Sequence, residues 1–194
     1  MKYMIAVLCG AALGLAGCSS SSPAAPSEYK VKFDTSKGEF VVQVHRDWSP
    51  LGADRFYELV KSGFYDEARF FRVVPGFVVQ WGINKDPKVT AEWRDKRIAD
   101  DPVKESNRPG TVSFATSGAG TRTTQLFVNL ASNARLDAIG FSPFGEVIEG
   151  MEAVARLYPG YSEEPEQQLI ETQGNAYLEK FYPNLDYIKT AHVE

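Results

Sequence analysis

Cysteine and histidine are scarce in this 194-residue sequence. Both cysteines, Cys9 and Cys18, lie near the N-terminus, so the rest of the chain has no thiol for a disulfide framework, a cysteine zinc site or a catalytic nucleophile. The two histidines, His45 and His192, are far apart and have no further ligands at the spacing that zinc sites use. We therefore expect the protein to work with neither a metal ion nor a cofactor.

Positive charge is not in excess either. The chain carries 21 lysines and arginines against 25 aspartates and glutamates, a formal net charge of −4. Proteins that bind nucleic acids usually present a basic face or stripe, so we expect no nucleic-acid partner. With 43% hydrophobic residues, the chain can build one good core and has little room for a second domain. We expect a monomer with one folded domain.

Residues 1–17 are predicted to be a lipoprotein signal peptide. Lys2 precedes a mostly apolar run over residues 4–16, which is shorter than a membrane span and typical of a signal peptide. The run ends in LAGC (15–18), which resembles the bacterial lipobox, in which the peptide is cleaved before the cysteine and the cysteine receives lipid chains. Cys18 is the predicted lipidation site. An ordinary signal peptide cut elsewhere and an uncleaved anchor are the alternatives.

Residues 18–28 are predicted to be the lipidated cysteine and a tether, followed by a folded domain over 29–194. The segment SSSSPAAPS (19–27) has no apolar periodicity and is typical of a flexible linker. Several acyl chains on one residue give stable membrane anchoring, so we expect a protein of the bacterial cell envelope. An aspartate after the cysteine would favour inner-membrane retention, and Ser19 stands there. This favours the outer membrane, facing the periplasm.

Short β-rich runs dominate the chain from residue 29 onward. Phe40, Val42 and Val44 alternate with other residues in the pattern of a strand that has one better-buried face. Pro75 and Gly76 divide another apolar stretch into two strand segments. Strands are expected within residues 29–35, 38–45, 69–82, 111–116, 125–130, 144–148 and 187–193, the first two forming a hairpin.

Two helices are expected beside these strands. Ser49 and Pro50 provide an N-cap and a proline at the first helical position, and Gly63 ends that helix. The second helix runs from Gly150 to Tyr158. Seven or eight short strands with two helices predict a mainly β fold, a closed β-barrel capped by the two helices.

Two segments have weaker patterns. Residues 84–110 are polar, with many charges and no clear period, and we expect a long surface excursion there. The C-terminal tail contains an amphipathic segment, in which Tyr177, Leu178 and Phe181 are the expected buried face.

Arg72 is out of place in the stretch RFFRVVPGFVVQWG (69–82), which is otherwise strongly apolar. Burying a guanidinium is costly unless it is paired or hydrogen-bonded. One interpretation is a structural ion pair on a barrel face, and the other is a chemical role. By itself this stretch favours the ion pair.

Three blocks of the sequence resemble successive signatures of the cyclophilins. They are FFRVVPGFVVQWG (70–82), SFATSGAGTRTTQLFVNLASNARLD (113–137) and FSPFGEVIEGMEAV (141–154). The resemblance covers about residues 29–194 and implies a closed, eight-stranded antiparallel barrel with two helices. The implied activity is cis–trans isomerisation of X–Pro bonds, and the implied partners are proline-containing segments of unfolded or partly folded proteins.

The resemblance implies that Arg72 is the catalytic residue. Rotation about a peptide bond is opposed by a resonance barrier of about 18–20 kcal/mol. As the bond twists, the prolyl nitrogen regains a lone pair, and a guanidinium aimed at it gains a hydrogen bond mainly in the twisted state. An interaction that forms mainly in the transition state raises the rate. Arginine suits this role because it donates without losing its proton.

The same resemblance assigns a substrate-binding role to ten further positions. The proline pocket would be lined by Phe77, Val78, Phe127 and Leu136. Gln80 would hold the arginine, Gln125 would supply a second amide, and Ala115 and Thr116 would belong to the strand whose backbone grips the peptide. Arg135 stands where many cyclophilins have a tryptophan that binds the drug cyclosporin, and Phe141 or Ser142 takes the place of a family histidine. Val78 replaces the usual methionine.

Alternatives remain open for these residues and for the chain. Each apolar residue alone could belong to the core of any barrel. The groove could serve a proline-peptide-binding module or a holdase, with isomerisation incidental, and the chain could be a lipoprotein scaffold. Arg72 favours the enzyme, since a pure binder needs no donor at the prolyl nitrogen.

Overall fold

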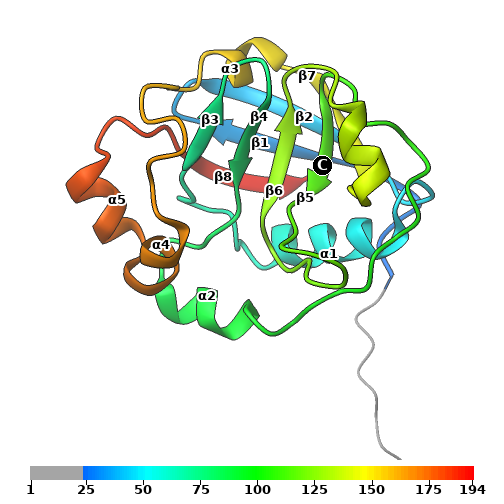
Figure 1. The fold of residues 1–194 in the computed structure, drawn as a ribbon, viewed down its shortest axis with the longest axis horizontal. Coiled ribbons are helices and arrows are strands. Elements are labelled where there is room, and N and C mark those ends of the chain that lie inside the picture. Colours follow the sequence, from blue (N-terminus) through cyan, green and yellow to red (C-terminus); the bar gives the residue numbers. More distant parts are fainter. Residues whose placement is uncertain (1–23) are drawn as a thin grey trace, which may run out of the picture.

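Eight antiparallel strands form one strongly curved sheet in the computed structural model, which describes residues 24–194 (Figure 1). The strands are β1 (Glu28–Thr35), β2 (Gly38–His45), β3 (Arg72–Val74), β4 (Val78–Trp81), β5 (Thr111–Phe114), β6 (Leu126–Asn129), β7 (Pro143–Glu149) and β8 (Ile188–Val193). Their order in the sheet is β3-β4-β6-β5-β7-β2-β1-β8. All the predicted strands are present, and the first two pair as the expected hairpin.

The prediction of a closed barrel is wrong, because the edge strands β3 and β8 do not pair with each other in the described chain. β3 has only three residues. The chain before it meets the start of β8 through an isolated bridge between Arg69 and Tyr187 and a hydrogen bond from the Glu67 amide to the Ile188 carbonyl at 2.7 Å. The Val73 amide of β3 instead donates to the carbonyl of Ser162 at 3.3 Å, so a loop covers that edge. The sheet is therefore a curled, open half-barrel.

The described residues form five α-helices and one 3₁₀ helix, where two helices were expected. They are α1 (Pro50–Lys61), α2 (Pro87–Trp93), the 3₁₀ helix η1 (Ala134–Ile139), α3 (Met151–Ala155), α4 (Gln167–Gln173) and α5 (Asn175–Phe181). The two predicted helices are α1 and α3. α1 packs against β7 and β8, whereas α2, α4 and α5 gather along one side of the sheet (Figure 1).

Residues 84–110 are more ordered than the predicted surface excursion. They contain α2 and a buried aspartate, Asp101, which reaches the N-terminus of α1. Its carboxylate accepts hydrogen bonds from the amides of Leu51 and Gly52 at 3.1 and 3.0 Å, from Ser49 Oγ at 2.6 Å and from Arg122 Nη2 at 3.0 Å. Burial raises the pKa of this carboxyl, but the four donors outweigh burial and hold the pKa below its usual range. Asp101 thus performs the capping that the sequence assigns to Ser49.

Aromatic side chains fill the main core, between the sheet and α1. The rings of Phe33 and Phe40 stack at 4.6 Å, and Phe33 meets Trp81 edge-on at 5.9 Å. From α1, Phe56 packs against Phe144 of β7 with 5.0 Å between ring centroids. All five side chains are almost completely buried. Such rings bury large apolar areas and account for much of the stabilisation of a core.

A second cluster lies under α4 and α5. Tyr177 and Leu178 are buried in it beside Phe71 and Ile170, as the amphipathic tail predicts. Phe181 is not buried: 55% of it is exposed. It lies in the last turn of α5, where its ring contacts Tyr177 at 5.5 Å but extends past the cluster.

Candidate active site

The outer face of the sheet carries the polar and apolar side chains of the candidate site. Side chains alternate between the two faces of a strand. Val79 and Val128 therefore enter the main core, and their neighbours Gln80 and Phe127 point to the other face. Arg72 is paired with Gln80 across β3 and β4, and Gln80 with Phe127 across β4 and β6. This alternation explains how an apolar strand accommodates an arginine: the guanidinium is on the outer face.

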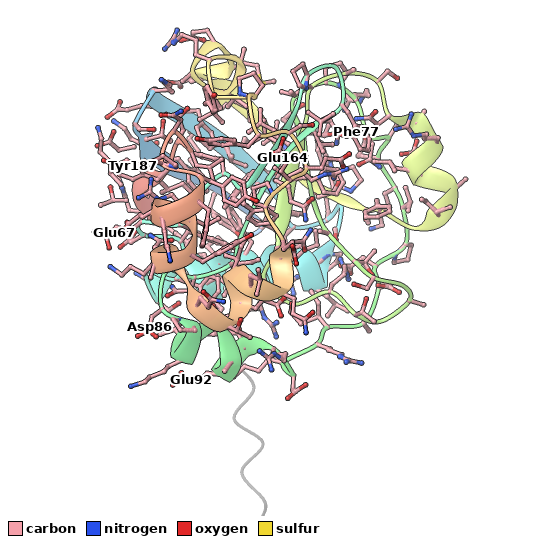
Figure 2. The ribbon with its side chains drawn as sticks, turned by 60° about the vertical axis from the view of Figure 1, so that its left-hand side comes forward. Glu67, Phe77, Asp86, Glu92, Glu164 and Tyr187 are labelled. Carbon is pink, nitrogen blue, oxygen red and sulfur yellow. The ribbon has the colours of Figure 1, made fainter. Side chains whose placement is uncertain are left out.

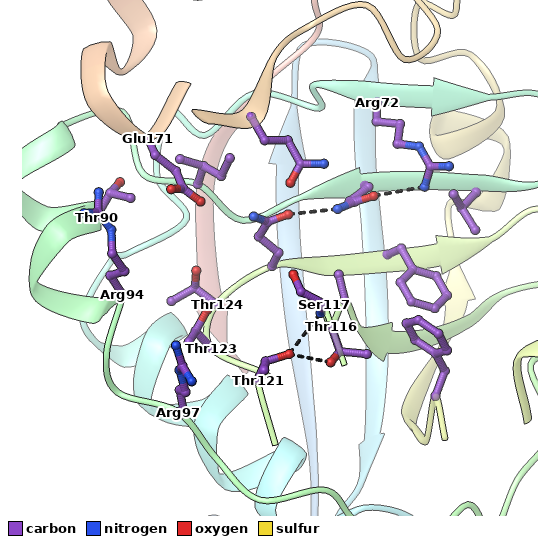
Figure 3. A pocket seen from close by; sticks show the side chains of 18 of the residues that line it. Arg72, Thr90, Arg94, Arg97, Thr116, Ser117, Thr121, Thr123, Thr124 and Glu171 are labelled. Carbon is purple, nitrogen blue, oxygen red and sulfur yellow. Dashed lines mark hydrogen bonds between the residues drawn. The ribbon is translucent and has the colours of Figure 1, made fainter. Parts of the chain in front are cut away.

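Three polar side chains form a hydrogen-bonded row across these strands (Figure 3). Arg72 Nη1 donates to Gln80 Oε1 at 3.1 Å, and Gln80 Nε2 donates to Gln125 Oε1 at 2.8 Å. Gln80 is buried, whereas 24% of the Arg72 side chain remains exposed. Arg72 Nε also donates to Glu163 Oε1 at 2.7 Å. The guanidinium is thus both ion-paired and held beside an open cavity.

An apolar pocket adjoins the guanidinium. Val78, Phe127 and Leu136 are its buried members, and Phe77, Ala115 and Phe141 pack against them partly exposed. The rings of Phe127 and Phe141 meet edge-on at 5.6 Å, and the guanidinium carbon of Arg72 lies 5.3 Å from the Phe77 ring. One wall is therefore aromatic and one is cationic, an arrangement suited to a small apolar ring with a weak acceptor atom beside it.

The cavity extends well beyond this pocket. Its volume is about 440 Å³, within the range of roughly 300–1,000 Å³ that ligand pockets occupy. Its other arm is lined by Thr90 of α2, Arg94, Arg97, the threonines of residues 121–124, and Glu171 of α4 (Figure 3). This arm was not predicted, since it is built from polar residues, two of them the buried Thr90 and Thr124, in segments without a clear period.

The comparison with known families agrees with this geometry. The family model described as cyclophilin-type peptidyl-prolyl cis-trans isomerase/CLD matches residues 30–173. The chain belongs to this family. A peptidyl-prolyl cis-trans isomerase A from Dickeya dadantii is 34% identical over 146 residues, which cover 69% of this chain and 73% of that protein. A peptidyl-prolyl cis-trans isomerase from Acinetobacter baylyi is 32% identical over 141 residues, covering 66% and 70%.

A solved cyclophilin has the same fold. The crystal structure of a Cryptosporidium parvum cyclophilin-type peptidyl-prolyl cis-trans isomerase covers 86% of this chain and 98% of its own, with a TM-score of 0.62. The two sequences are 21% identical, so this likeness concerns the fold alone.

The structure brings most of the predicted site residues of this cyclophilin together. The predicted residues that line this cavity are Arg72, Phe77, Val78, Gln80, Ala115, Thr116, Gln125, Phe127, Leu136 and Phe141. Arg135 stands outside the lining, with its guanidinium carbon 4.7 Å from the ring of Phe77. Cys18 lies outside the described residues. Residues 24–194 contain no cluster of histidine, cysteine or acidic side chains able to hold a metal ion, and none of their helices has the length and hydropathy of a membrane span.

A buried network of asparagines under the pocket was not predicted. Asn107 Nδ2 donates to the carbonyl of Phe141 at 2.9 Å, and Asn133 Nδ2 donates to the carbonyl of Phe77 at 3.0 Å. Asn129 joins the two, donating to Asn107 Oδ1 at 3.1 Å and accepting from Asn133 at 2.8 Å. The network therefore fixes the backbone at two aromatic walls of the pocket. The only sequence signal is the pair Asn129 and Asn133, four residues apart at and just after the end of β6.

Asp137 anchors the 3₁₀ helix that carries Leu136. Its carboxylate accepts from Ser106 Oγ at 2.6 Å and from the amide and side chain of Asn107 at 2.9 and 2.7 Å. Burial raises the pKa of Asp137, but these donors hold it below its usual range, so the carboxylate stays ionised at neutral pH. The apolar contact from Leu136 is thus fixed by a hydrogen-bonded, partly buried carboxylate next to it in the sequence.

Proposed function

We propose that this protein is a lipid-anchored peptidyl-prolyl cis–trans isomerase of the bacterial envelope, which assists the folding of envelope or secreted proteins. The isomerase activity follows from membership of the family: relatives that share 32–34% identity with two thirds of the chain carry the name peptidyl-prolyl cis-trans isomerase. The observation that supports it in the structure is the row from Arg72 through Gln80 to Gln125 beside an aromatic pocket.

In the proposed mechanism the prolyl ring enters the pocket between Phe77, Phe127 and Leu136. The solved Cryptosporidium neighbour was also crystallised in the presence of the dipeptide Ala-Pro. The Arg72 guanidinium then donates to the prolyl nitrogen as the bond twists. A charge-assisted hydrogen bond contributes about 1.5–3 kcal/mol, which corresponds to roughly a ten- to 150-fold rate gain when it forms only in the transition state. The rest of the acceleration comes from binding the peptide in a twisted geometry.

The envelope location is supported by the sequence of residues 1–18 and by the position of the folded part. Ala25 is buried, and its amide donates to Asp54 Oδ1 at 2.9 Å, so the folded domain begins a few residues after Cys18. At no more than about 3.6 Å per residue, the intervening segment would hold the domain within roughly 20–25 Å of a lipid on Cys18. Clients emerging near the membrane surface would meet the active site there.

The isomerase activity is tested with a protease-coupled assay of X–Pro isomerisation on the full-length protein. We expect a rate clearly above the uncatalysed one. A protein that bound proline peptides without accelerating isomerisation would instead be a binding module or holdase.

The anchor is tested by labelling cells with a fatty-acid analogue. The full-length protein should take up the label, and Cys18→Ala should not, because the thiol that receives the lipid is gone. Cys9→Ala is the matched control and should keep the label. Label retained on Cys18→Ala would contradict the lipobox interpretation.

A further inference from the structure

A loop between α3 and α4 reaches Arg72 on the side that Gln80 leaves open. Glu163 in this loop accepts from Arg72 Nε at 2.7 Å, and the same carboxylate oxygen also contacts Nη2. Gln80 takes one N–H of Nη1. A guanidinium has five N–H groups. Glu163 thus accepts along the edge formed by Nε and Nη2, and Gln80 accepts from Nη1. The remaining N–H groups are left for the substrate.

The backbone just before Glu163 is fixed by hydrogen bonds. Ser162 accepts from the amide of Val73 in β3, and its own amide donates to Pro159 at 2.9 Å. Ser162 has a φ of +46°, an uncommon value for a residue other than glycine. Residues held in such conformations are maintained by the surrounding structure and cluster at functional sites.

Tyrosine rings hold the rest of the loop. Tyr161 lies edge-on to Tyr158 at 5.2 Å and to Tyr182 at 5.1 Å. Tyr182 Oη donates to the carbonyl of Glu164, the residue after Glu163, at 3.2 Å. Figure 2 labels Glu164 and so marks this loop. The carboxylate is therefore presented to Arg72 by a braced segment.

The ion pair between Glu163 and Arg72 adds little to the stability of the fold. In Glu163, 58% of the side chain is exposed, and exposed ion pairs contribute little to stability. An arginine side chain, however, has many rotamers, and ordering it is entropically costly. Holding the guanidinium from two sides before substrate arrives removes that cost from the catalytic step.

We propose that Glu163 is a positioning residue, which holds the Arg72 guanidinium in its productive orientation. The proposal rests on the catalytic role proposed above for Arg72. Glu163 itself does not touch the substrate, so its removal should lower kcat and leave KM nearly unchanged.

The test compares full-length Glu163→Ala and Glu163→Gln with Glu164→Gln, an exposed neighbour with the same change of charge. We expect kcat to fall about three- to tenfold in Glu163→Ala, since part of a hydrogen-bond contribution is lost. Glu163→Gln keeps an acceptor oxygen and should lie between it and the wild type. Glu164→Gln should match the wild type. Melting temperatures should be alike in all four proteins.

Salt provides a readout that a purely structural role would not change. As the salt concentration rises from about 0.1 to 1 M, the wild-type kcat should decline towards that of Glu163→Gln. The reason is that the Debye screening length falls from roughly 10 Å to roughly 3 Å, which weakens the ion pair between Glu163 and Arg72. The kcat of Glu163→Gln should change less.

A kcat in Glu163→Ala equal to that of the wild type would overturn the proposal. A higher kcat would also overturn it and would show that Glu163 blocks the arginine. An equal loss of kcat in Glu164→Gln would overturn it as well. The NMR signal of the Arg72 Nε–H, assigned by its loss in Arg72→Lys, separates the two proposals. It should be protected from exchange in the wild type and exchange faster in Glu163→Ala. If no isomerase activity were found, this signal would still decide whether Glu163 orders Arg72.

Discussion

Replacing Arg72 by alanine should remove most isomerase activity and leave the protein folded. The guanidinium lies on the outer face of the sheet, and its removal opens no hole in the main core. The substitution removes a hydrogen bond to Gln80 and an exposed ion pair with Glu163. Exposed pairs contribute about 0–1 kcal/mol, and Gln80 keeps its bond to Gln125. We therefore expect a loss of stability of no more than about 1–2 kcal/mol.

The effect on the rate should be larger. Loss of a charge-assisted hydrogen bond of about 1.5–3 kcal/mol corresponds to a fall of roughly ten- to 150-fold in kcat/KM. Arg72→Lys should lose nearly as much, since an ammonium cannot bond side-on to Glu163 while also reaching Gln80. Arg135→Ala is the matched control: its guanidinium also lies over the Phe77 ring, but outside the lining of the cavity.

The assay is the protease-coupled measurement of X–Pro isomerisation, with circular dichroism and urea unfolding on the same samples. Arg135→Ala should keep most of the activity. A kcat/KM within twofold of the wild type in Arg72→Ala, with an unchanged dichroism spectrum, would refute the catalytic assignment. An equal loss in Arg135→Ala would show that charge near Phe77, rather than the position of one guanidinium, controls the rate.

Two further predictions concern inhibition and pH. Cyclosporin should inhibit the protein poorly and Arg135→Trp about ten- to hundredfold better, because an indole restores a donor and an aromatic surface; tight inhibition of the wild type would contradict this. Asp101→Asn should cost about 3–5 kcal/mol of unfolding free energy at pH 7. Because the folded-state pKa of Asp101 is lowered, its contribution to the free energy of unfolding is present above an unfolded pKa of about 3.9. This contribution is lost as the pH falls through the folded-state pKa. Urea unfolding should show a smaller difference in unfolding free energy between the wild type and Asp101→Asn at pH 3 than at pH 7. An equal difference at the two pH values would contradict this prediction.

The strands and most of the site are predictable because both depend on local alternation. In β4, alternate residues face the core and the cavity, so a polar Gln80 between Val79 and Trp81 already indicates an exposed or functional face. The sequence blocks around Arg72 and Phe127 add the chemistry of that face. A one-residue shift in register would send every one of these side chains to the wrong side.

The features that were not predicted depend on interactions between distant segments. Asp101 caps α1 from 49 residues away, and Asn107 reaches Phe141 across 34 residues. Nothing in the local pattern of residues 84–110 indicates which polar side chain will be buried. The exposure of Phe181 also depends on distant segments. Its helical spacing from Tyr177 places the two rings on one face of α5, but the residues packed against that face determine how much of it is buried.

The open edge of the sheet and the positioning of the arginine have a common origin. An unpaired edge strand exposes backbone donors, and folded proteins cover such edges with a loop, a helix or charge. β3 does not pair with β8, and its Val73 amide is satisfied by Ser162 instead. Covering that edge places the next residue, Glu163, beside the side chain of Arg72, the residue that precedes Val73. A closed barrel would leave no room at this edge for the loop. The departure from closure is therefore what allows a carboxylate to hold the guanidinium from the side opposite Gln80.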